Sequence, residues 1–304
     1  MSNPYAKPWL SLADQVKKLE YRGLVVSDPA AACEYLGHMN YYRFAGYSLA
    51  FCVSPHQFRP GTTFNQVKEA ADFDASLRSL VGDWLQVAEL DIRTQTAHHF
   101  AKTCGAFGHC DASNFQRRFS RKVTHAQWLA RLQKDTQQSE KERFVMHFKQ
   151  IYSQYPDLPI WTAAEVMTFG SLARMIAGMT KPDRRALGLL YGFTPEQFSS
   201  TVLHLSYIRN VCAHHSRLWE RLHQIKPVLP TDSEWQPPIL TDNGRLFCTL
   251  LLLRKITRRT TLTHTISDRY RDKINALLLN PPSVPNPDTR LGLPVNWINH
   301  PVWK

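Results

Sequence analysis

The sequence lacks the long apolar run that a membrane helix requires. Its longest strongly apolar stretch, CTLLLL before Arg254, is far shorter than the roughly 18 to 20 residues that cross a bilayer. The first residues, MSNPYAKPWL, also lack the basic region, apolar stretch and small-residue cleavage site of a signal peptide. We therefore expect a cytoplasmic protein that has no membrane partner.

Cysteine is scarce and irregularly spaced. The 304 residues include six cysteines without a regular framework, which favours reduced thiols over disulfides. His98, His99, Cys104, His109 and Cys110 are residue types that zinc prefers, but their spacing fits no paired C-x2-C pattern. The Walker A, G-x-G-x-x-G and H-E-x-x-H motifs are missing as well. We expect neither a metal nor a cofactor.

Acidic residues are outnumbered by basic ones. The chain has 37 Lys and Arg against 25 Asp and Glu, a formal net charge of +12. An excess of positive charge attracts polyanions, because binding releases their counterions. Nucleic acid is therefore the first partner to consider, and a basic surface that serves only solubility is the alternative.

Alternating strand patterns are nearly missing, whereas helical periodicity covers most of the chain, which predicts an all-α fold. Asp28 and Pro29 mark the cap and first turn of one helix. Thr194 and Gln197 form a T-x-x-Q capping box at the start of another. The predicted helices cover residues 11–23, 28–39, 63–102 with a bend or break near 72–74, 126–155, 160–179, 182–191, 195–224 and 244–279.

The segment YIRNVCAHHSRLW places polar residues inside an apolar spacing. At about 100° per residue on an ideal helix, one face is shared by Leu205, Ile208, Cys212, His215, Trp219 and Leu222. Arg209, Asn210 and His214 lie on the polar side, together with Arg217. The periodicity therefore directs His215 into the core and turns His214 away from it.

An arginine and a histidine five positions apart supply what phosphodiester cleavage needs. Arg209 offers a fixed cation for the negative charge of the transition state, and the imidazole of His214 can move protons near neutral pH. Asn210 could orient that imidazole or bind a phosphate oxygen. In RNA the 2′-hydroxyl already supplies the nucleophile, so no metal need be invoked.

Arg209 to His214, R-N-V-C-A-H, matches the R-x4-6-H motif of HEPN domains. The surrounding segment resembles the Abi-like (AbiD/AbiF) abortive-infection proteins, which confer phage resistance. Similar blocks are KPWLSLADQVKKLEYRGL, YLGHMNYYRFAGY, FDASLRSLVGDWLQVAELDIRTQ, LPIWTAAEVMTFGSL and LGLPVNWINHPVW. The resemblance therefore spans nearly the whole chain.

This resemblance implies one Abi-like domain over residues 1–304, built on an all-α, HEPN-like helical bundle. Residues 1–61 would be an N-terminal helical extension, 62–279 the HEPN-like core, and 280–304 an extended tail packed on the surface. Six prolines in the last 24 residues agree with an extended tail.

The resemblance also implies an activity and partners. HEPN nucleases are metal-independent endoribonucleases that commonly form homodimers, in which two motifs face a shared cleft. They leave a 2′,3′-cyclic phosphate and a 5′-hydroxyl. Some relatives are associated with a structured noncoding RNA, so a non-catalytic binder of such an RNA remains the alternative. A phage-sensing interaction protein is a third reading.

Further residues are candidates for RNA contacts. The run NFQRRFSRKV combines two phenylalanines with basic residues, which suits either base stacking or a basic loop whose phenylalanines enter the core. Residues 244–273 carry eight Lys or Arg against two Asp, which favours a phosphate-contacting face over a merely solvated one. The predicted RNA-binding residues are Arg117, Arg118, Arg121, Lys122, Arg254, Lys255, Arg258 and Arg259, with Tyr42 and Arg43 from HMNYYRFAGY. For the tyrosines of that segment, packing between helices is the commoner alternative.

Four residues are candidates for a supporting role at the predicted catalytic site. His215 and Arg217 follow the motif directly in the chain. Glu89 and Arg93 are four positions apart on a predicted helix. They could form an ion pair with each other or contribute to the site from a second helix.

Overall fold

The computed structural model describes residues 6, 8–120, 123–240, 242–259 and 261–304. Within these ranges the chain forms thirteen α-helices, and its sheet content is one antiparallel hairpin of β1 (Cys52–Ser54) and β2 (Gln57–Phe58). The predicted all-α fold is confirmed. No helix in the described part of the chain combines the length and the apolar character needed to traverse a bilayer.

The chain divides into two compact units. The first comprises Met1–Leu77 and Ala276–Pro287, and the second comprises Arg78–Asn275 and Asp288–Lys304. The long helix α4 (Phe64–Cys104) contributes residues to both units. The organisation as one Abi-like domain stays a prediction.

Three short helices build the first unit. They are α1 (Leu12–Tyr21), α2 (Pro29–Met39) and α3 (Tyr41–Ser48), and the 3-10 turn Leu49–Phe51 leads from α3 into the hairpin. Helix α2 packs against both α1 and α3. Asp28 caps α2 by accepting a hydrogen bond from the Ala31 N–H, and Pro29 occupies the first turn, as the sequence predicted. Phe44 stacks on Phe64 in the core, with ring centroids 4.6 Å apart.

Helix α4 continues through residues 72–74, where the sequence predicted a bend or break. Asp74 is buried, and its carboxylate accepts a 2.6 Å hydrogen bond from the Tyr47 hydroxyl of α3. Because the buried carboxylate of Asp74 has a hydrogen-bond partner, its burial is compatible with a continuous helix. The expected break is therefore wrong.

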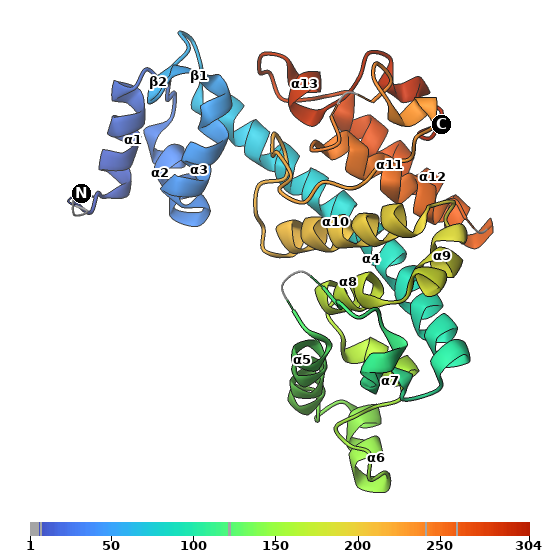
Figure 1. Ribbon diagram of the computed structural model, residues 1–304. Coiled ribbons are helices and arrows are strands. Elements are labelled where there is room, and N and C mark those ends of the chain that lie inside the picture. The colour runs from blue at the N-terminus through green and yellow to red at the C-terminus, as the bar shows by residue number, and fades with distance from the viewer. Residues whose placement is uncertain (1–5, 7, 121–122, 241, 260) are drawn as a thin grey trace. The chain divides into compact units, whose positions relative to one another are not determined.

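In the second unit, α10 (Pro195–Ala213) packs against α8 (Phe169–Gly178) and α9 (Lys181–Leu189), as Figure 1 shows. Helix α10 begins with the predicted capping box. The Thr194 hydroxyl accepts from the Gln197 N–H, and the Gln197 side chain accepts from the Thr194 N–H.

Four of the predicted helices are interrupted or shorter than expected. The ranges 126–155, 160–179 and 244–279 each hold two helices, and the helix that begins at residue 195 ends at Ala213. Thr168 caps α8 through its side chain and so separates it from α7 (Ile160–Val166). A turn at Ser139–Glu142 separates α5 (His125–Gln138) from α6 (Arg143–Ile151).

The helices of this unit also include α11 (Leu246–Thr257) and α12 (Thr261–Leu278). Its 3-10 turns are Gly108–Cys110, Ala112–Asn114 and Ser233–Trp235. The last residues of α12 belong to the first unit.

The C-terminal segment is folded rather than extended throughout. It contains α13 (Pro287–Leu291) and the 3-10 turn Trp297–Asn299. Trp303 is buried, its indole N–H donates to Asn275 Oδ1 at 2.8 Å, and its ring lies 6.0 Å from that of Trp84. Aromatic side chains contribute much of a core's apolar area. The segment after Asp288 is thus anchored in the second unit.

Two buried histidines lie beside α10. His204 Nδ1 donates to the Ile225 carbonyl at 2.6 Å, and its Nε2 accepts from the Thr249 hydroxyl at 2.9 Å. The ring of His223 lies 5.3 Å from that of His204, with its Nδ1 3.5 Å from Thr249 Oγ1. Burial lowers the pKa of His204 from 6.5 to about 4 and that of His223 to about 3. Both residues are therefore neutral at pH 7.

These histidines predict that stability falls as the pH drops from 7 to 5. Both folded pKa values lie below the unfolded value of 6.5. The unfolded chain therefore binds more protons, and the stability present above pH 6.5 is lost toward pH 4. We expect a loss on the order of 2 kcal/mol for each histidine.

Urea unfolding at pH 7 and pH 5 measures this loss. The variant His204→Gln, which keeps one donor and one acceptor, should show a shallower pH dependence than the wild type. The substitution His98→Gln, on the exposed side of α4, is the matched control. Equal slopes for the wild type and His204→Gln would contradict the assignment.

Candidate active site

The R-x4-H segment occupies the last turn of α10. His214 is the residue that caps the helix. The Ser216 N–H donates to the Val211 carbonyl and the His215 N–H donates to the Cys212 carbonyl, and these two bonds form a Schellman motif. His215 has a φ of 52°, the left-handed conformation that this motif requires after the cap. The motif histidine thus sits where the helix stops.

The prediction of a helix over residues 195–224 is therefore wrong beyond Ala213, and so is the placement of His215 in the core. Helical periodicity no longer applies once the chain has turned. His215 and Leu222 are exposed, whereas Trp219 is buried as expected.

Arg209, Asn210 and His214 face away from the apolar interior. Ile208, which precedes Arg209, and Val211, which follows Asn210, are buried. Asn210 and His214 are exposed, and 42% of the Arg209 side chain is accessible. Arg209 Nη1 donates to Asn210 Oδ1 at 3.4 Å. The end of α10 therefore presents a guanidinium, an amide and an imidazole on accessible surface.

A carboxylate from α4 reaches Arg209. Glu89 Oε2 lies 3.6 Å from Arg209 Nε, and Glu89 Oε1 accepts from Arg93 Nη2 at 2.6 Å. The side chains of Glu89 and Arg93 are largely buried. Glu89 therefore forms the ion pair with Arg93 that the sequence left open, and it also contacts Arg209 of α10. Its role at a catalytic site stays a prediction.

Arg93 is itself held by the backbone at the junction of α7 and α8. Its Nη1 donates to the Met167 carbonyl at 2.8 Å and also to the Ala164 carbonyl. The last carbonyls of a helix have no partner within the helix, so this buried guanidinium satisfies them. The sequence did not lead us to this anchor, although Thr168, which caps α8, marks the junction.

The charges of this group favour an anion. Two guanidinium groups share one carboxylate, which leaves a formal charge of +1. Glu89 holds Arg209 through a charge-assisted contact, and the accessible part of the guanidinium retains further N–H donors. Guanidinium donors match the geometry of phosphate oxygens. Arg209, held by Glu89, therefore offers accessible donors that suit a phosphate oxygen.

Arg217 lies in the loop after α10 and is half-buried. Its Nη1 is 3.7 Å from Glu220 Oε2, and Glu220 also pairs with Arg290. The periodicity placed Arg217 beside Arg209 only because it assumed that the helix continued. The turn at His215 directs Arg217 to this loop instead.

In the basic run that begins at Asn114, the phenylalanines are buried and the described arginines are exposed. Phe115 and Phe119 are buried in an aromatic cluster with Trp128, at centroid distances of 6.0 and 5.5 Å. Arg117 and Arg118 are exposed. The phenylalanines therefore enter the core rather than stack on bases, while the two arginines stay available to phosphates. The predicted contacts of Arg121 and Lys122 fall outside the described residues.

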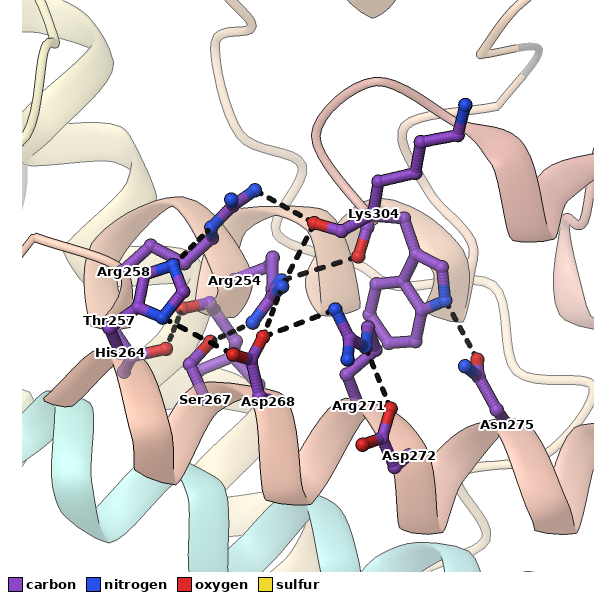
Figure 2. A network of polar contacts seen from close by, with 12 residues as sticks. Arg254, Thr257, Arg258, His264, Ser267, Asp268, Arg271, Asp272, Asn275 and Lys304 are labelled. Atoms are coloured by element: carbon purple, nitrogen blue, oxygen red, sulfur yellow. Dashed lines mark hydrogen bonds and ion pairs between the residues drawn. The ribbon is translucent and has the colours of Figure 1, made fainter.

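Arg254 does not lie on a phosphate-contacting face, contrary to the prediction. Its side chain is fully buried and, as Figure 2 shows, Arg254 faces Ser267, Asp268 and the main-chain oxygen of Lys304. The distances from the guanidinium are 2.9 Å to Ser267 Oγ, 2.6 Å to Asp268 Oδ1 and 2.9 Å to the Lys304 oxygen. It also donates to the Trp303 carbonyl at 3.2 Å. Arg254 thus holds the C-terminal segment.

The other basic residues of RKITRR differ from Arg254. Arg258 is exposed and donates to the Lys304 main-chain oxygen at 2.8 Å. Lys255 Nζ lies 5.3 Å from the Phe193 ring centroid, and the Arg259 guanidinium carbon lies 5.2 Å from that of Tyr191. Lys255 and Arg259 are therefore partly engaged in cation–π contacts.

Tyr42 and Arg43 belong to α3 in the first unit, and both are exposed.

Among the residues considered for zinc, His99 Nε2 lies 2.9 Å from Asp183 Oδ1, and His109 is buried with its Nε2 3.6 Å from Cys110 Sγ. In the described part of the chain, no three His, Cys, Asp or Glu side chains come together as metal ligands would.

Comparison with known proteins gives one finding. A family model described as Abi-like protein matches residues 34–220, more than half of the 304-residue chain. The matched region includes Glu89, Arg93, Arg209 and His214. No curated protein and no solved structure matches the chain.

Proposed function

The chain belongs to the family of Abi-like proteins, and we propose that it acts in abortive infection as a metal-independent endoribonuclease of the HEPN type. One observation carries this proposal: the R-x4-H pair ends α10 on accessible surface, and its arginine is held by Glu89. A pair that served only packing would be expected in the interior.

In the proposed reaction, the 2′-oxygen of a nucleotide attacks the adjacent phosphorus, and the bond from phosphorus to the 5′-oxygen breaks. The 2′-hydroxyl loses a proton and the departing 5′-oxygen gains one. His214 moves one of these protons, and Arg209 stabilises the negative charge that builds up on the phosphate oxygens. The products are a 2′,3′-cyclic phosphate and a 5′-hydroxyl. Asn210, which contacts Arg209, assists by binding a phosphate oxygen.

Glu89 and Arg93 act through Arg209 in this proposal. Glu89 keeps the guanidinium in one orientation, and Arg93 holds Glu89 in place. An arginine that is oriented before the reaction need not be ordered during it, which lowers the barrier.

A homodimer completes the proposed nuclease. The resemblance to HEPN proteins implies that two copies bring their motifs to a shared cleft. The exposure of Asn210 and His214 supports this, because a second copy can approach them.

The second candidate is a protein that binds a structured noncoding RNA without cleaving it. The exposed Arg117 and Arg118 and the net charge of +12 favour this function equally. The two candidates differ in the expected effect of removing Arg209. A nuclease would lose cleavage, whereas a binder would lose affinity for RNA.

We expect Arg209→Ala to lower the rate of RNA cleavage in the presence of chelator by about 10²- to 10³-fold, the usual effect of removing one donor to a developing oxyanion. The variant should fold normally, because the side chain is accessible. Cleavage of a labelled RNA, with Arg217→Ala as the matched control, measures the effect. If the wild type leaves RNA intact and Arg209→Ala only lowers the affinity and its salt dependence, the second candidate is correct.

A further inference from the structure

The first unit contains a cavity that the proposed cleavage reaction does not use. Its volume is about 520 Å³, within the range of roughly 300 to 1,000 Å³ that is typical of small-molecule sites. Its walls come from α1, the end of α2, the start of α3 and the β1–β2 hairpin. The cavity thus lies among four elements of one unit.

The charge of the cavity wall is of one sign. Lys18 and Arg22 line it together with His38 and His56, whereas no aspartate or glutamate is among its lining residues. In the described part of the chain, neither Lys18 nor Arg22 forms an ion pair with a carboxylate. Two cations beside a cavity without a counter-charge favour an anionic ligand. Phosphate is the anion that such lysine and arginine pairs commonly bind.

Arg22 is held in place for this role. Its Nη1 donates to the Tyr41 hydroxyl at 2.9 Å. This contact uses one of five guanidinium N–H donors. The cation is therefore oriented by a neutral group, which leaves its charge uncompensated.

An aromatic ring stands beside these cations. Tyr42 lines the cavity, and 72% of the residue is exposed. Its ring meets that of Tyr41 edge to face, with centroids 6.5 Å apart, so one tyrosine supports the other. An exposed ring next to a basic cavity is suited to stacking a nucleobase. Leu10, Leu12 and Leu49 add apolar wall for a base or a ribose.

We propose that this cavity binds a nucleoside monophosphate unit, with the phosphate on Lys18 and Arg22 and the base against Tyr42. The unit can be a free nucleotide or one unpaired nucleotide of an RNA. The choice of RNA as a source rests on the proposed function, whereas the chemistry of the ligand does not. The cavity thus has a task separate from cleavage.

Calorimetric titration of the full chain tests this proposal. The probes are uridine 5′-monophosphate, an unstructured octauridylate RNA and inorganic phosphate. The RNA is titrated in a His214→Ala background so that cleavage does not consume it. Tyr42→Ala should weaken nucleotide or RNA binding about fivefold or more, because it removes the stacking ring. Lys18→Gln should lower the salt dependence of RNA binding by about 0.7 in the log–log slope.

Two controls separate stacking from a general loss of structure. Tyr42→Phe keeps the ring and should bind within about twofold of the parent, since stacking does not need the hydroxyl. Tyr21→Ala removes a tyrosine that is 93% exposed at the end of α1 and does not line the cavity. It should leave binding unchanged.

The outcomes show whether the cavity binds a nucleotide at all, and whether that nucleotide is free or part of an RNA. A loss with both nucleotide and RNA supports the proposal and shows that a free nucleotide suffices, whereas a loss with RNA alone assigns the site to an unpaired nucleotide in a chain. No binding of either probe overturns the proposal. So does an equal effect of Tyr42→Ala and Tyr21→Ala, or phosphate binding as tight as that of the nucleotide. A wild type that binds through Tyr42 yet cleaves nothing would refute the nuclease and not the cavity.

Discussion

His214→Ala is expected to lower the rate of RNA cleavage by about 10²- to 10⁴-fold, the range over which positioned general acids and bases contribute. The imidazole lies on the accessible surface where α10 ends, so its removal creates no cavity in the core. The helix end is kept by backbone bonds of the Schellman motif that do not involve this side chain. Single-turnover cleavage of a labelled RNA gives the rate, and the unfolding midpoint shows whether the fold is intact.

His98→Ala is the matched control, because it removes an exposed histidine of α4 outside the motif. It should cleave at the wild-type rate. If His214→Ala retained that rate as well, His214 would have no part in proton transfer. If both variants lost it, the loss would not report on the motif.

Arg254→Ala is expected to destabilise the second unit by about 3 kcal/mol. The substitution leaves a cavity and removes one partner each of Asp268 and of the Trp303 and Lys304 main-chain oxygens. We place the loss at the lower end of the usual range for broken buried pairs, because Asp268 keeps Arg271, at 3.1 Å, as a partner. Urea unfolding measures the loss.

Arg258→Ala provides the comparison for this effect. Arg258 follows Arg254 by one helical turn and donates to the same Lys304 oxygen at 2.8 Å, but it is exposed. Exposed contacts of this kind contribute about 1 kcal/mol or less. Equal losses for the two variants would contradict the assignment of Arg254 as the buried anchor of the C-terminal segment.

The helical class and several helix starts could be predicted because they depend on local signals. The Thr194 capping box and the pair of Asp28 and Pro29 act within a few residues of the chain. Helix ends were less predictable. The end of α10 depends on a left-handed residue at His215, where a glycine would have been the usual signal. Periodicity alone continued the helix past this point and so misplaced His215.

At the candidate site, too, pairs of residues close in the chain could be predicted, whereas contacts between distant residues could not. The spacing of Arg209 and His214 can be read from the chain, and so can the pair of Glu89 and Arg93. The contact of Glu89 with Arg209 joins residues that are 120 positions apart, and no local pattern encodes it. The burial of Arg254 was missed because composition cannot distinguish an exposed cation from one whose partners come from the C-terminal segment.

End-group analysis of RNA treated with the purified protein in the presence of chelator tests the central claim most directly. The account predicts new 2′,3′-cyclic phosphate and 5′-hydroxyl ends with the wild type, and none with His214→Ala. Ends that carry a 3′-hydroxyl and a 5′-phosphate, or cyclic phosphate ends that persist in His214→Ala, would contradict it.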